Sequence, residues 1–155
     1  VANLPYYIST AILQRLIEQR EVFSEMVLML QKEVVERITA KAGSSERGFL
    51  TVLVEAFCEA EKLFDVPPNA FRPAPKVWSS VVRLRVKQSP VIADEKLFRE
   101  LLSLGFAQKR KTILNNLKAK FADAKEILEN SQIEPNRRAE TLTLNEWLKL
   151  LSAIK

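Results

Sequence analysis

The sequence predicts an α/β segment followed by an all-α segment. Up to residue 88, short apolar runs typical of buried strands alternate with stretches whose apolar residues recur at helical spacing. Beyond Gln88-Ser89-Pro90 only the helical spacing remains. We therefore expect two domains, residues 1–88 and 89–155, joined near residues 87–93.

The composition limits the classes of function. The chain has 155 residues, 47% hydrophobic and 28% charged, as in a globular protein with a core. Its net charge of +5 favours a polyanionic partner. Because there is no histidine, we expect neither a histidine-based triad nor a His-ligated metal, and we assign no metal site. No run of about 18 apolar residues is present, so no membrane span is expected.

The first half of the α/β segment begins with strand-like residues. Val1 and Ala2 suggest the end of a strand, and a helix with an apolar face over residues 12–17 should follow, capped by Ser9 or Thr10. The continuous apolar run 26–30 predicts a strand buried on both faces of a mainly parallel sheet.

Two helices and two strands should complete this segment. One helix covers residues 34–38 and is stopped at Gly43, and another has its apolar face over residues 50–58. On that face we expect Cys58, the only cysteine, as a buried thiol in a reducing cytoplasm. A strand at 63–66 ends at two prolines, and alternating residues from 78 to 86 predict a half-exposed strand.

The all-α segment should hold four helices. Asp94 caps the first, which Gly105 ends, and the second covers residues 106–121 with apolar positions on one face. Asp123 begins a short third helix. Thr143 and Glu146 form a capping-box pair that opens the last one.

The segment Asn3-Leu4-Pro5-Tyr6 carries the clearest chemistry. Pro5 keeps Leu4 extended, so these groups lie at the carboxyl end of a strand, where open α/β sheets bind ligands. The Asn3 side-chain oxygen and the Leu4 carbonyl could accept hydrogen bonds from the exocyclic amine of an adenine. That would localise its lone pair and aim it at an electrophilic methyl group, while Tyr6 stacks on the extruded base. The alternative is a polar turn with Tyr6 in the core.

Two further segments could contact a nucleic acid. Prolines stiffen the loop 71–77, where Phe71 could form the other wall of a base pocket and Lys76 could meet a phosphate. Alternatively, Phe71 plugs the core beneath a strand connection. Between residues 106 and 121 there are five basic residues and no acidic one, which suggests a stripe along a phosphate backbone or only a solvated helix face. These five residues are Lys109, Arg110, Lys111, Lys118 and Lys120. Arg137 and Arg138 could extend the basic surface.

Five segments, in this order, resemble the ribosomal RNA adenine dimethyltransferases, most of all those of the small subunit. The erythromycin-resistance rRNA methyltransferases are a poorer match. The segments are Asn3-Leu4-Pro5-Tyr6, 31–38 (QKEVVERI), 71–84 (FRPAPKVWSSVVRL), 106–117 (FAQKRKTILNNL) and 138–142 (RAETL).

The resemblance implies the carboxyl-terminal part of a Rossmann-like methyltransferase sheet followed by a small helical rRNA-binding domain. S-adenosylmethionine would methylate twice the N6 amine of each of two adjacent adenines near the 3′ end of small-subunit rRNA, in a pre-30S-type particle in the cytoplasm, with neither membrane nor DNA involved. Asn3 would lie between cofactor and adenine, the Leu4 carbonyl would face the amine within the motif that Pro5 stiffens, and Tyr6 and Phe71 would sandwich the base.

Two features depart from that pattern. Trp78 stands where the family pattern has a small polar residue. The chain has only three glycines and no Gly-rich cofactor loop, so we expect it to carry the target-base half of a site and to be inactive alone. The alternative interpretation, from another class, is a non-catalytic RNA- or ribosome-binding module.

Overall fold

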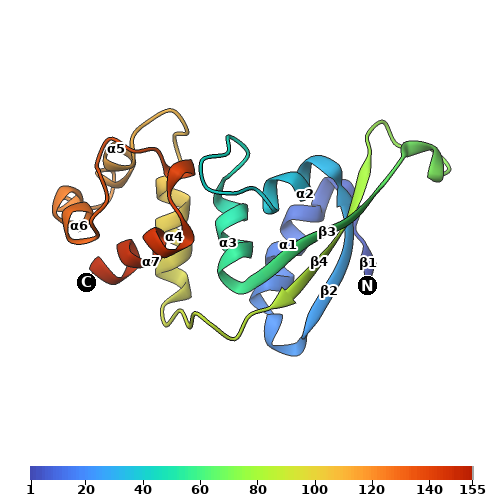
Figure 1. The fold of residues 1–155 in the computed structure, drawn as a ribbon, viewed down its shortest axis with the longest axis horizontal. Helices are drawn as coiled ribbons and strands as arrows, with labels where there is room; N and C mark the ends of the chain where they lie inside the picture. The colour runs from blue at the N-terminus through green and yellow to red at the C-terminus, as the bar shows by residue number, and fades with distance from the viewer. Residues whose placement is uncertain (155) are drawn as a thin grey trace. The chain divides into compact units, whose positions relative to one another are not determined.

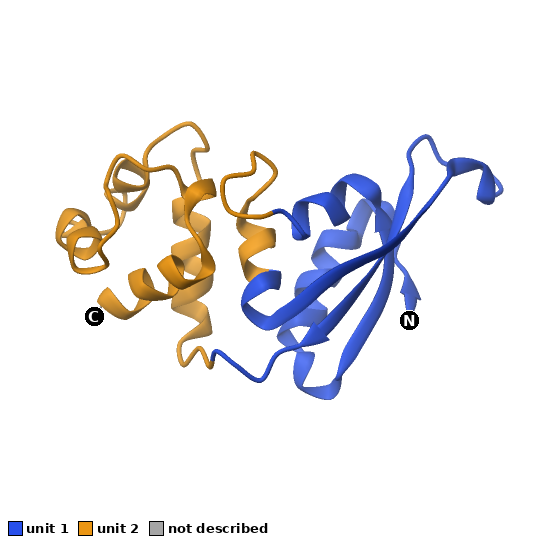
Figure 2. Ribbon diagram, in the orientation of Figure 1, with its two compact units in different colours: residues 1–40, 54–90 blue, residues 41–53, 91–155 orange. Residues whose placement is uncertain are grey.

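The computed structural model describes residues 1–154, which form two compact units. Unit 1 comprises residues 1–40 and 54–90, and unit 2 comprises residues 41–53 and 91–155 (Figure 2). The expected division after residue 88 placed residues 41–53 in the first domain, whereas in the structure they group with the helical unit.

Unit 1 is built on a four-stranded sheet of order β1-β2-β4-β3 (Figure 1). The strands are β1 (Ala2–Asn3), β2 (Glu25–Gln31), β3 (Cys58–Val66) and β4 (Ser79–Val86). The β1–β2 pair is parallel, but β4 runs antiparallel to both β2 and β3. Within the described residues the sheet is therefore mixed, and the expectation of a mainly parallel sheet was wrong because β3 and β4 return on each other as a hairpin.

Unit 1 also contains two complete α-helices, the end of a third, which begins in unit 2, and three 3₁₀ turns. The α-helices are α1 (Ser9–Glu18), α2 (Lys32–Ile38) and α3 (Phe49–Phe57); the turns are η1 (Tyr6–Ile8), η2 (Arg20–Val22) and η3 (Pro68–Ala70). The buried residues of α1 include Leu13 and Ile17, as its spacing predicts. The predicted cap was wrong, because Ile8 holds the N-cap position and the Ser9 hydroxyl donates to the Tyr6 carbonyl at 3.2 Å.

The third and fourth strands begin at other residues than expected. Cys58 is buried, as predicted, but it starts β3 opposite Val86 rather than ending a helix. Most residues of this edge strand are exposed and several are charged, so its early part shows no apolar pattern in the sequence. Strand β4 starts at Ser79, which leaves Trp78 outside it, and only its second half is half-exposed.

Besides the start of α3, unit 2 contains four α-helices. They are α4 (Glu95–Gly105), α5 (Ile113–Leu117), α6 (Ala124–Asn130) and α7 (Leu144–Ala153), with the 3₁₀ turn η4 (Ala139–Thr141) before the last. Asp94 accepts from the Leu97 amide at 2.9 Å, and both bonds of the Thr143–Glu146 capping box are present. These predicted caps are confirmed, whereas the Asp123 side chain makes no capping bond to α6.

The predicted helix over residues 106–121 was wrong, since only residues 113–117 of that stretch are α-helical. Residues 106–112 form turns that start where α4 ends at Gly105. Thr112 then caps α5 by accepting from the Asn115 amide at 3.2 Å. The basic residues around position 110 therefore lie on a loop.

Candidate functional site

One edge of the unit 1 sheet collects the segments that the sequence singled out. Asn3 ends β1 opposite Met29, and Gln31 at the end of β2 lies opposite Ser79 at the start of β4. Val66, the last residue of β3, also faces Ser79. Because β1 and β2 are parallel, this is the carboxyl edge of both strands, where open α/β sheets bind ligands.

The segment Asn3-Leu4-Pro5-Tyr6 leaves β1 at this edge. The Asn3 side chain is exposed, and Leu4 is buried with its amide donating to the Met29 carbonyl at 3.2 Å. Within residues 1–154, nothing donates a hydrogen bond to the Leu4 carbonyl. The Asn3 amide side chain and the unpaired Leu4 carbonyl therefore lie next to each other at the carboxyl edge of the sheet. These are the two acceptors that the sequence predicted.

Tyr6 lies in η1 and is half-buried, not a core residue as the alternative interpretation required. Its hydroxyl is hydrogen-bonded to the hydroxyl of Ser79, which is fully buried. This bond joins the first motif to the strand that follows the proline-rich loop, 73 residues later. The phenol ring is thus held in place by its far end, which leaves its face for other contacts.

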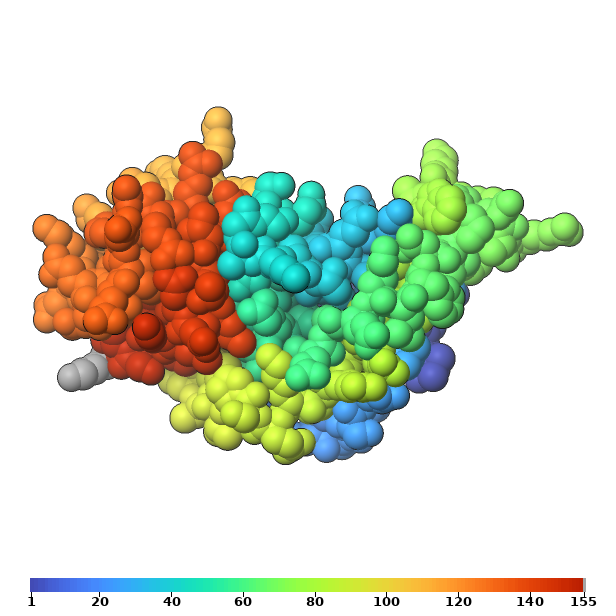
Figure 3. Space-filling view, viewed as in Figure 1, coloured from blue at the N-terminus to red at the C-terminus, as the bar shows by residue number. Residues whose placement is uncertain are grey.

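Residues 67–78 form an arm between β3 and β4 that projects from unit 1 (Figures 1 and 3). Phe71 is half-buried, with its amide bonded to the Pro68 carbonyl at 3.2 Å, and Lys76 is exposed. Among the described residues the rings of Tyr6 and Phe71 do not contact each other. The structure brings both motifs to one sheet edge without closing the predicted sandwich.

In unit 2, the loop between α4 and α5 carries a cluster of positive charge. Lys109, Arg110 and Lys111 are all exposed. Together with Gln108 and Arg138 they line a hollow of about 580 Å³. The Lys109 ammonium donates to the Ser45 carbonyl at 2.5 Å. Four cations around one hollow form a surface that attracts phosphate groups. We call the surface formed by Lys109, Arg110, Lys111 and Arg138 the basic hollow.

A buried amide shapes this loop. Asn116 on α5 is 4% exposed, and its side-chain nitrogen donates to the carbonyls of Gly105 at 2.9 Å and Gln108 at 3.1 Å. Both acceptors lie where α4 gives way to the basic loop. Asn116 therefore fixes the path of the chain that presents Lys109 and its neighbours.

The remaining predicted basic residues are less uniform. Lys118 and Lys120 follow α5 and are exposed, but the Lys120 ammonium pairs with Glu100 of α4 at 2.6 Å. The sequence analysis counted acidic residues only within 106–121, so it missed Glu100, which lies outside that segment. Arg138 lines the basic hollow, whereas Arg137 pairs with Glu146.

The family model described as "Ribosomal RNA adenine dimethylase" matches residues 1–155. The chain belongs to this family. Curated relatives named "Ribosomal RNA small subunit methyltransferase A" include that of Geobacillus sp. (strain WCH70), 43% identical over 164 residues, which covers 100% of this chain and 56% of the relative. The one from Acinetobacter baylyi (strain ATCC 33305 / BD413 / ADP1) is 45% identical over 152 residues, 97% of this chain and 55% of the relative. The chain thus spans little more than half the length of these relatives.

Solved structures of two methyltransferases are similar to this chain. A dimethyladenosine transferase from Plasmodium falciparum superposes with a TM-score of 0.84 at 33% identity, over 97% of this chain and 64% of that one. The 23S rRNA methyltransferase ErmE gives 0.68 at 23% identity, over 98% and 63%, and shows the fold alone. These likenesses confirm the predicted fold class, part of a Rossmann-like methyltransferase sheet with a helical unit.

Around Trp78, this family member has a cluster that the sequence did not reveal. The Trp78 carbonyl accepts from the Lys32 amide at 2.9 Å, and the Lys32 ammonium lies 5.6 Å from the centre of the indole ring. The same ammonium lies 3.5 Å from Asp65. The Ser80 hydroxyl, at 2.5 Å from that carboxylate, and then the neighbouring Lys62 and Lys32 hold the pKa of Asp65 below its usual range. The carboxylate is therefore ionised at neutral pH and attracts the Lys32 ammonium.

Two other kinds of chemistry find less support. Burial raises the pKa of Cys58 to about 11, even though Arg20 and Lys87 act in the opposite direction, so the thiol is not a ready nucleophile. Within residues 1–154 no three potential His, Cys, Asp or Glu ligands gather as a metal site would require. Nor does that part of the chain contain a helix whose length and apolar character would suit a membrane crossing.

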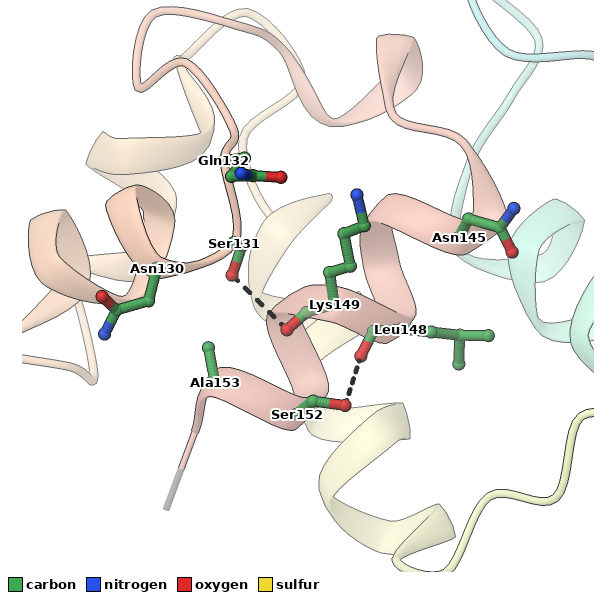
Figure 4. Close-up of a pocket in the computed structure, with 8 residues that line it drawn as sticks. All are labelled: Asn130, Ser131, Gln132, Asn145, Leu148, Lys149, Ser152 and Ala153. Carbon is green, nitrogen blue, oxygen red and sulfur yellow. Dashed lines mark hydrogen bonds between the residues drawn. The ribbon is translucent and has the colours of Figure 1, made fainter.

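A second hollow lies in unit 2 at the end of α6 and along α7 (Figure 4). It measures about 880 Å³ and is lined mainly by amide and hydroxyl side chains. Its two serine hydroxyls already donate hydrogen bonds, Ser131 to the Ile127 carbonyl and Ser152 to the Leu148 carbonyl. The lining residues are Asn130, Ser131, Gln132, Asn145, Leu148, Lys149, Ser152 and Ala153.

Proposed function

We propose that this chain forms the target-base half and the RNA-binding part of an S-adenosylmethionine-dependent methyltransferase. Its product would be N6,N6-dimethyladenine at two adjacent positions near the 3′ end of small-subunit rRNA, made on a pre-30S-type particle in the cytoplasm. The observation that carries the proposal is the unused Leu4 carbonyl beside the exposed Asn3 at the carboxyl edge of the sheet. Family membership and the Plasmodium falciparum structure support it.

The chemistry of the acceptors fits an exocyclic amine. The adenine N6 amine is a weak nucleophile because its lone pair is delocalised into the ring. Hydrogen bonds from its two N–H groups to the Asn3 oxygen and the Leu4 carbonyl localise that pair and orient it. Such fixed dipoles stabilise charge as it develops on the amine, without reorganisation at the moment of reaction. No side chain here is needed as a general base.

The aromatic groups would hold the base itself. An adenine in a duplex must leave its stack before its amine can react, and an aromatic face compensates for the stacking it loses. Tyr6 offers such a face, because its hydroxyl is anchored on Ser79. Phe71 would complete the sandwich if the arm moves onto the base, since its ring does not reach Tyr6 in this structure.

The residues present fit only one side of the cofactor. S-adenosylmethionine supplies the methyl group when bound, and Asn3 is the one residue of this chain that we assign to it. All three glycines, Gly43, Gly48 and Gly105, lie in unit 2, so unit 1 has no Gly-rich loop to approach a nucleoside closely. The 155-residue chain should therefore bind S-adenosylmethionine weakly or not at all and be inactive alone. Calorimetric titration checks this, and micromolar affinity would contradict it.

The basic hollow supports the RNA-binding part of the proposal. Phosphate contacts give affinity and register but read no bases, so Lys109, Arg110 and Lys111 would place the RNA while the Tyr6 pocket selects the adenine. Lys76, Lys118 and the paired Lys120 would add weaker contacts. Because this surface is formed wholly within unit 2, it also supports the alternative of a non-catalytic RNA- or ribosome-binding module.

Single-turnover methyl transfer separates the two possibilities. The changes are made in an enzyme that carries this chain together with a working cofactor site. Asn3→Ala should slow the transfer by about a hundredfold or more while RNA affinity changes little. Tyr6→Ala and Phe71→Ala should each lose about 1–3 kcal/mol of base stacking.

Matched controls lie elsewhere in the chain. Asn130→Ala removes an exposed amide from unit 2, and Phe64→Ala removes the ring of a β3 residue that is 56% exposed. Both should leave the rate unchanged. Rates within about twofold of wild type for all three site variants would rule out the target-base assignment, because the expected effects are larger. If the enzyme that carries this chain bound RNA but incorporated no methyl group, the alternative of a non-catalytic binding module would be favoured.

A further inference from the structure

Trp78 is an exposed indole on an immobilised backbone. The residue is 48% exposed, yet its carbonyl accepts from the Lys32 amide at 2.9 Å and the next residue begins β4. The backbone that carries the exposed indole is therefore anchored at its carbonyl. An aromatic side chain on an anchored backbone has only two side-chain torsions to order, so it loses little conformational entropy when it binds a flat partner.

One face of the ring already has a neighbour. The Lys32 ammonium lies 5.6 Å from the ring centre, within the range of a cation–π contact, and Asp65 holds that ammonium at 3.5 Å. The carboxylate thereby favours the position of the ammonium beside the indole. The ammonium adds positive charge to a place where an aromatic surface meets water.

The backbone of Trp78 adjoins the strand that anchors the proposed base pocket. Ser79, the residue that follows Trp78, is the one whose hydroxyl bonds to Tyr6. Gln31, which precedes Lys32, is the β2 residue opposite Ser79. Trp78 and Lys32 thus lie at the same sheet edge as the pocket, where RNA neighbours of the target adenine must pass.

We propose that Trp78, with Lys32 beside it, is a stacking site for an unpaired nucleotide that flanks the target adenine. The inference rests on the proposed function and deepens it, because it assigns a second base-binding position outside the Asn3–Tyr6 pocket. The nucleobase stacks on the exposed part of the indole, and the Lys32 charge lies near its backbone. Such stacking tolerates any base, since every base has a π-face.

The chain contains a built-in probe for this contact. It has two tryptophans, and Trp147 is fully buried in unit 2, so acrylamide should quench mainly Trp78. A short oligoadenylate should protect Trp78 from acrylamide, whereas inorganic polyphosphate, which has charge but no bases, should not. Protection by polyphosphate equal to that by oligoadenylate would overturn base stacking.

Three substitutions test the stacking in binding experiments on the full chain. Trp78→Ala and Trp78→Leu should weaken oligoadenylate binding by about five- to 150-fold, and Trp78→Phe should restore most of it. Phe64→Ala, which removes another exposed ring of unit 1, should have no effect. Circular dichroism melts check that every variant is folded.

Each remaining outcome decides the matter. Wild-type affinity in Trp78→Ala, or Trp78→Leu binding as well as Trp78→Phe, would overturn the inference, and so would failure of the wild-type chain to bind oligoadenylate. Failure of the proposed function has a different signature. In that case Asn3→Ala would leave methyl transfer unaltered while the Trp78 variants still bound nucleotide more weakly.

Discussion

Replacing Lys109, Arg110 and Lys111 together by Ala tests whether the basic hollow binds RNA. All three are exposed, and two of them, Arg110 and Lys111, make no side-chain hydrogen bond within residues 1–154. Removing one cation that binds a phosphate reduces the slope of log affinity against log salt by about 0.7 for single-stranded and 0.9 for duplex nucleic acid. Two to three such phosphates therefore predict a slope smaller by about 1.4 to 2.7.

The same variant should remain folded. Exposed charges contribute about 0–1 kcal/mol each to stability. The one bond that the triple variant breaks is that of Lys109 to the Ser45 carbonyl, worth about 1 kcal/mol. Arg138 stays in the hollow and should preserve some of the salt dependence.

The assay is binding of small-subunit ribosomal RNA across a salt series, with thermal melting alongside. A control variant, Lys96→Ala with Lys125→Ala and Lys149→Ala, removes the same charge from other sites of unit 2. If the slope of the test variant falls no more than that of the control, the hollow is only a solvated surface. A collapsed melting temperature would show that the three residues support the fold instead.

Two further predictions concern the stability of unit 2. A Cβ added to Gly105 would lie 2.5 Å from the ring of the fully buried Trp147, so Gly105→Ala should lower the free energy of unfolding by about 1–3 kcal/mol. The control Gly48→Ala adds its Cβ to open space and should change that free energy by less than about 0.5 kcal/mol. Equal urea midpoints for the two variants would contradict this prediction. The Arg137 guanidinium, and then Thr143, hold the pKa of Glu146 below its ordinary 4.5, so the stabilisation by this carboxylate is complete above that pH and is lost as the pH falls through the lowered value. The stability difference between wild type and Glu146→Gln, about 1 kcal/mol at neutral pH, should vanish in acid melts, and a pH-independent difference would refute the role of its charge.

The elements with strong periodicity and a cap were predictable from sequence. Asp94 and Thr143 indicated the starts of α4 and α7, and the apolar run 26–30 indicated β2. The failure at residues 106–121 has a tertiary origin. Apolar residues recur at helical spacing up to Phe121, but Asn116 uses its side chain to bind the turn before α5, and the helix is only five residues long. Local spacing does not report such tertiary bonds.

The site was predictable only where its groups are contiguous. Asn3 and Leu4 adjoin in sequence, so their joint role as acceptors could be inferred from the motif. Other parts of the site join residues far apart in the chain. Lys32 contacts Trp78, and Arg138 lines the basic hollow together with residues 109–111. These pairings follow from the sheet and from helix packing, which no single segment specifies.

The register of β4 on β2 shows how the core determines the site. Met26, Leu28 and Leu30 lie opposite Leu84, Val82 and Ser80, and all six are buried. A slip by one residue would turn this set of β4 side chains to the other face and break the packing of the core. The same register sets Ser79 opposite Gln31 at the sheet edge, where its hydroxyl meets Tyr6. The packing that holds the strands together therefore also fixes the ring on which the target base is proposed to stack.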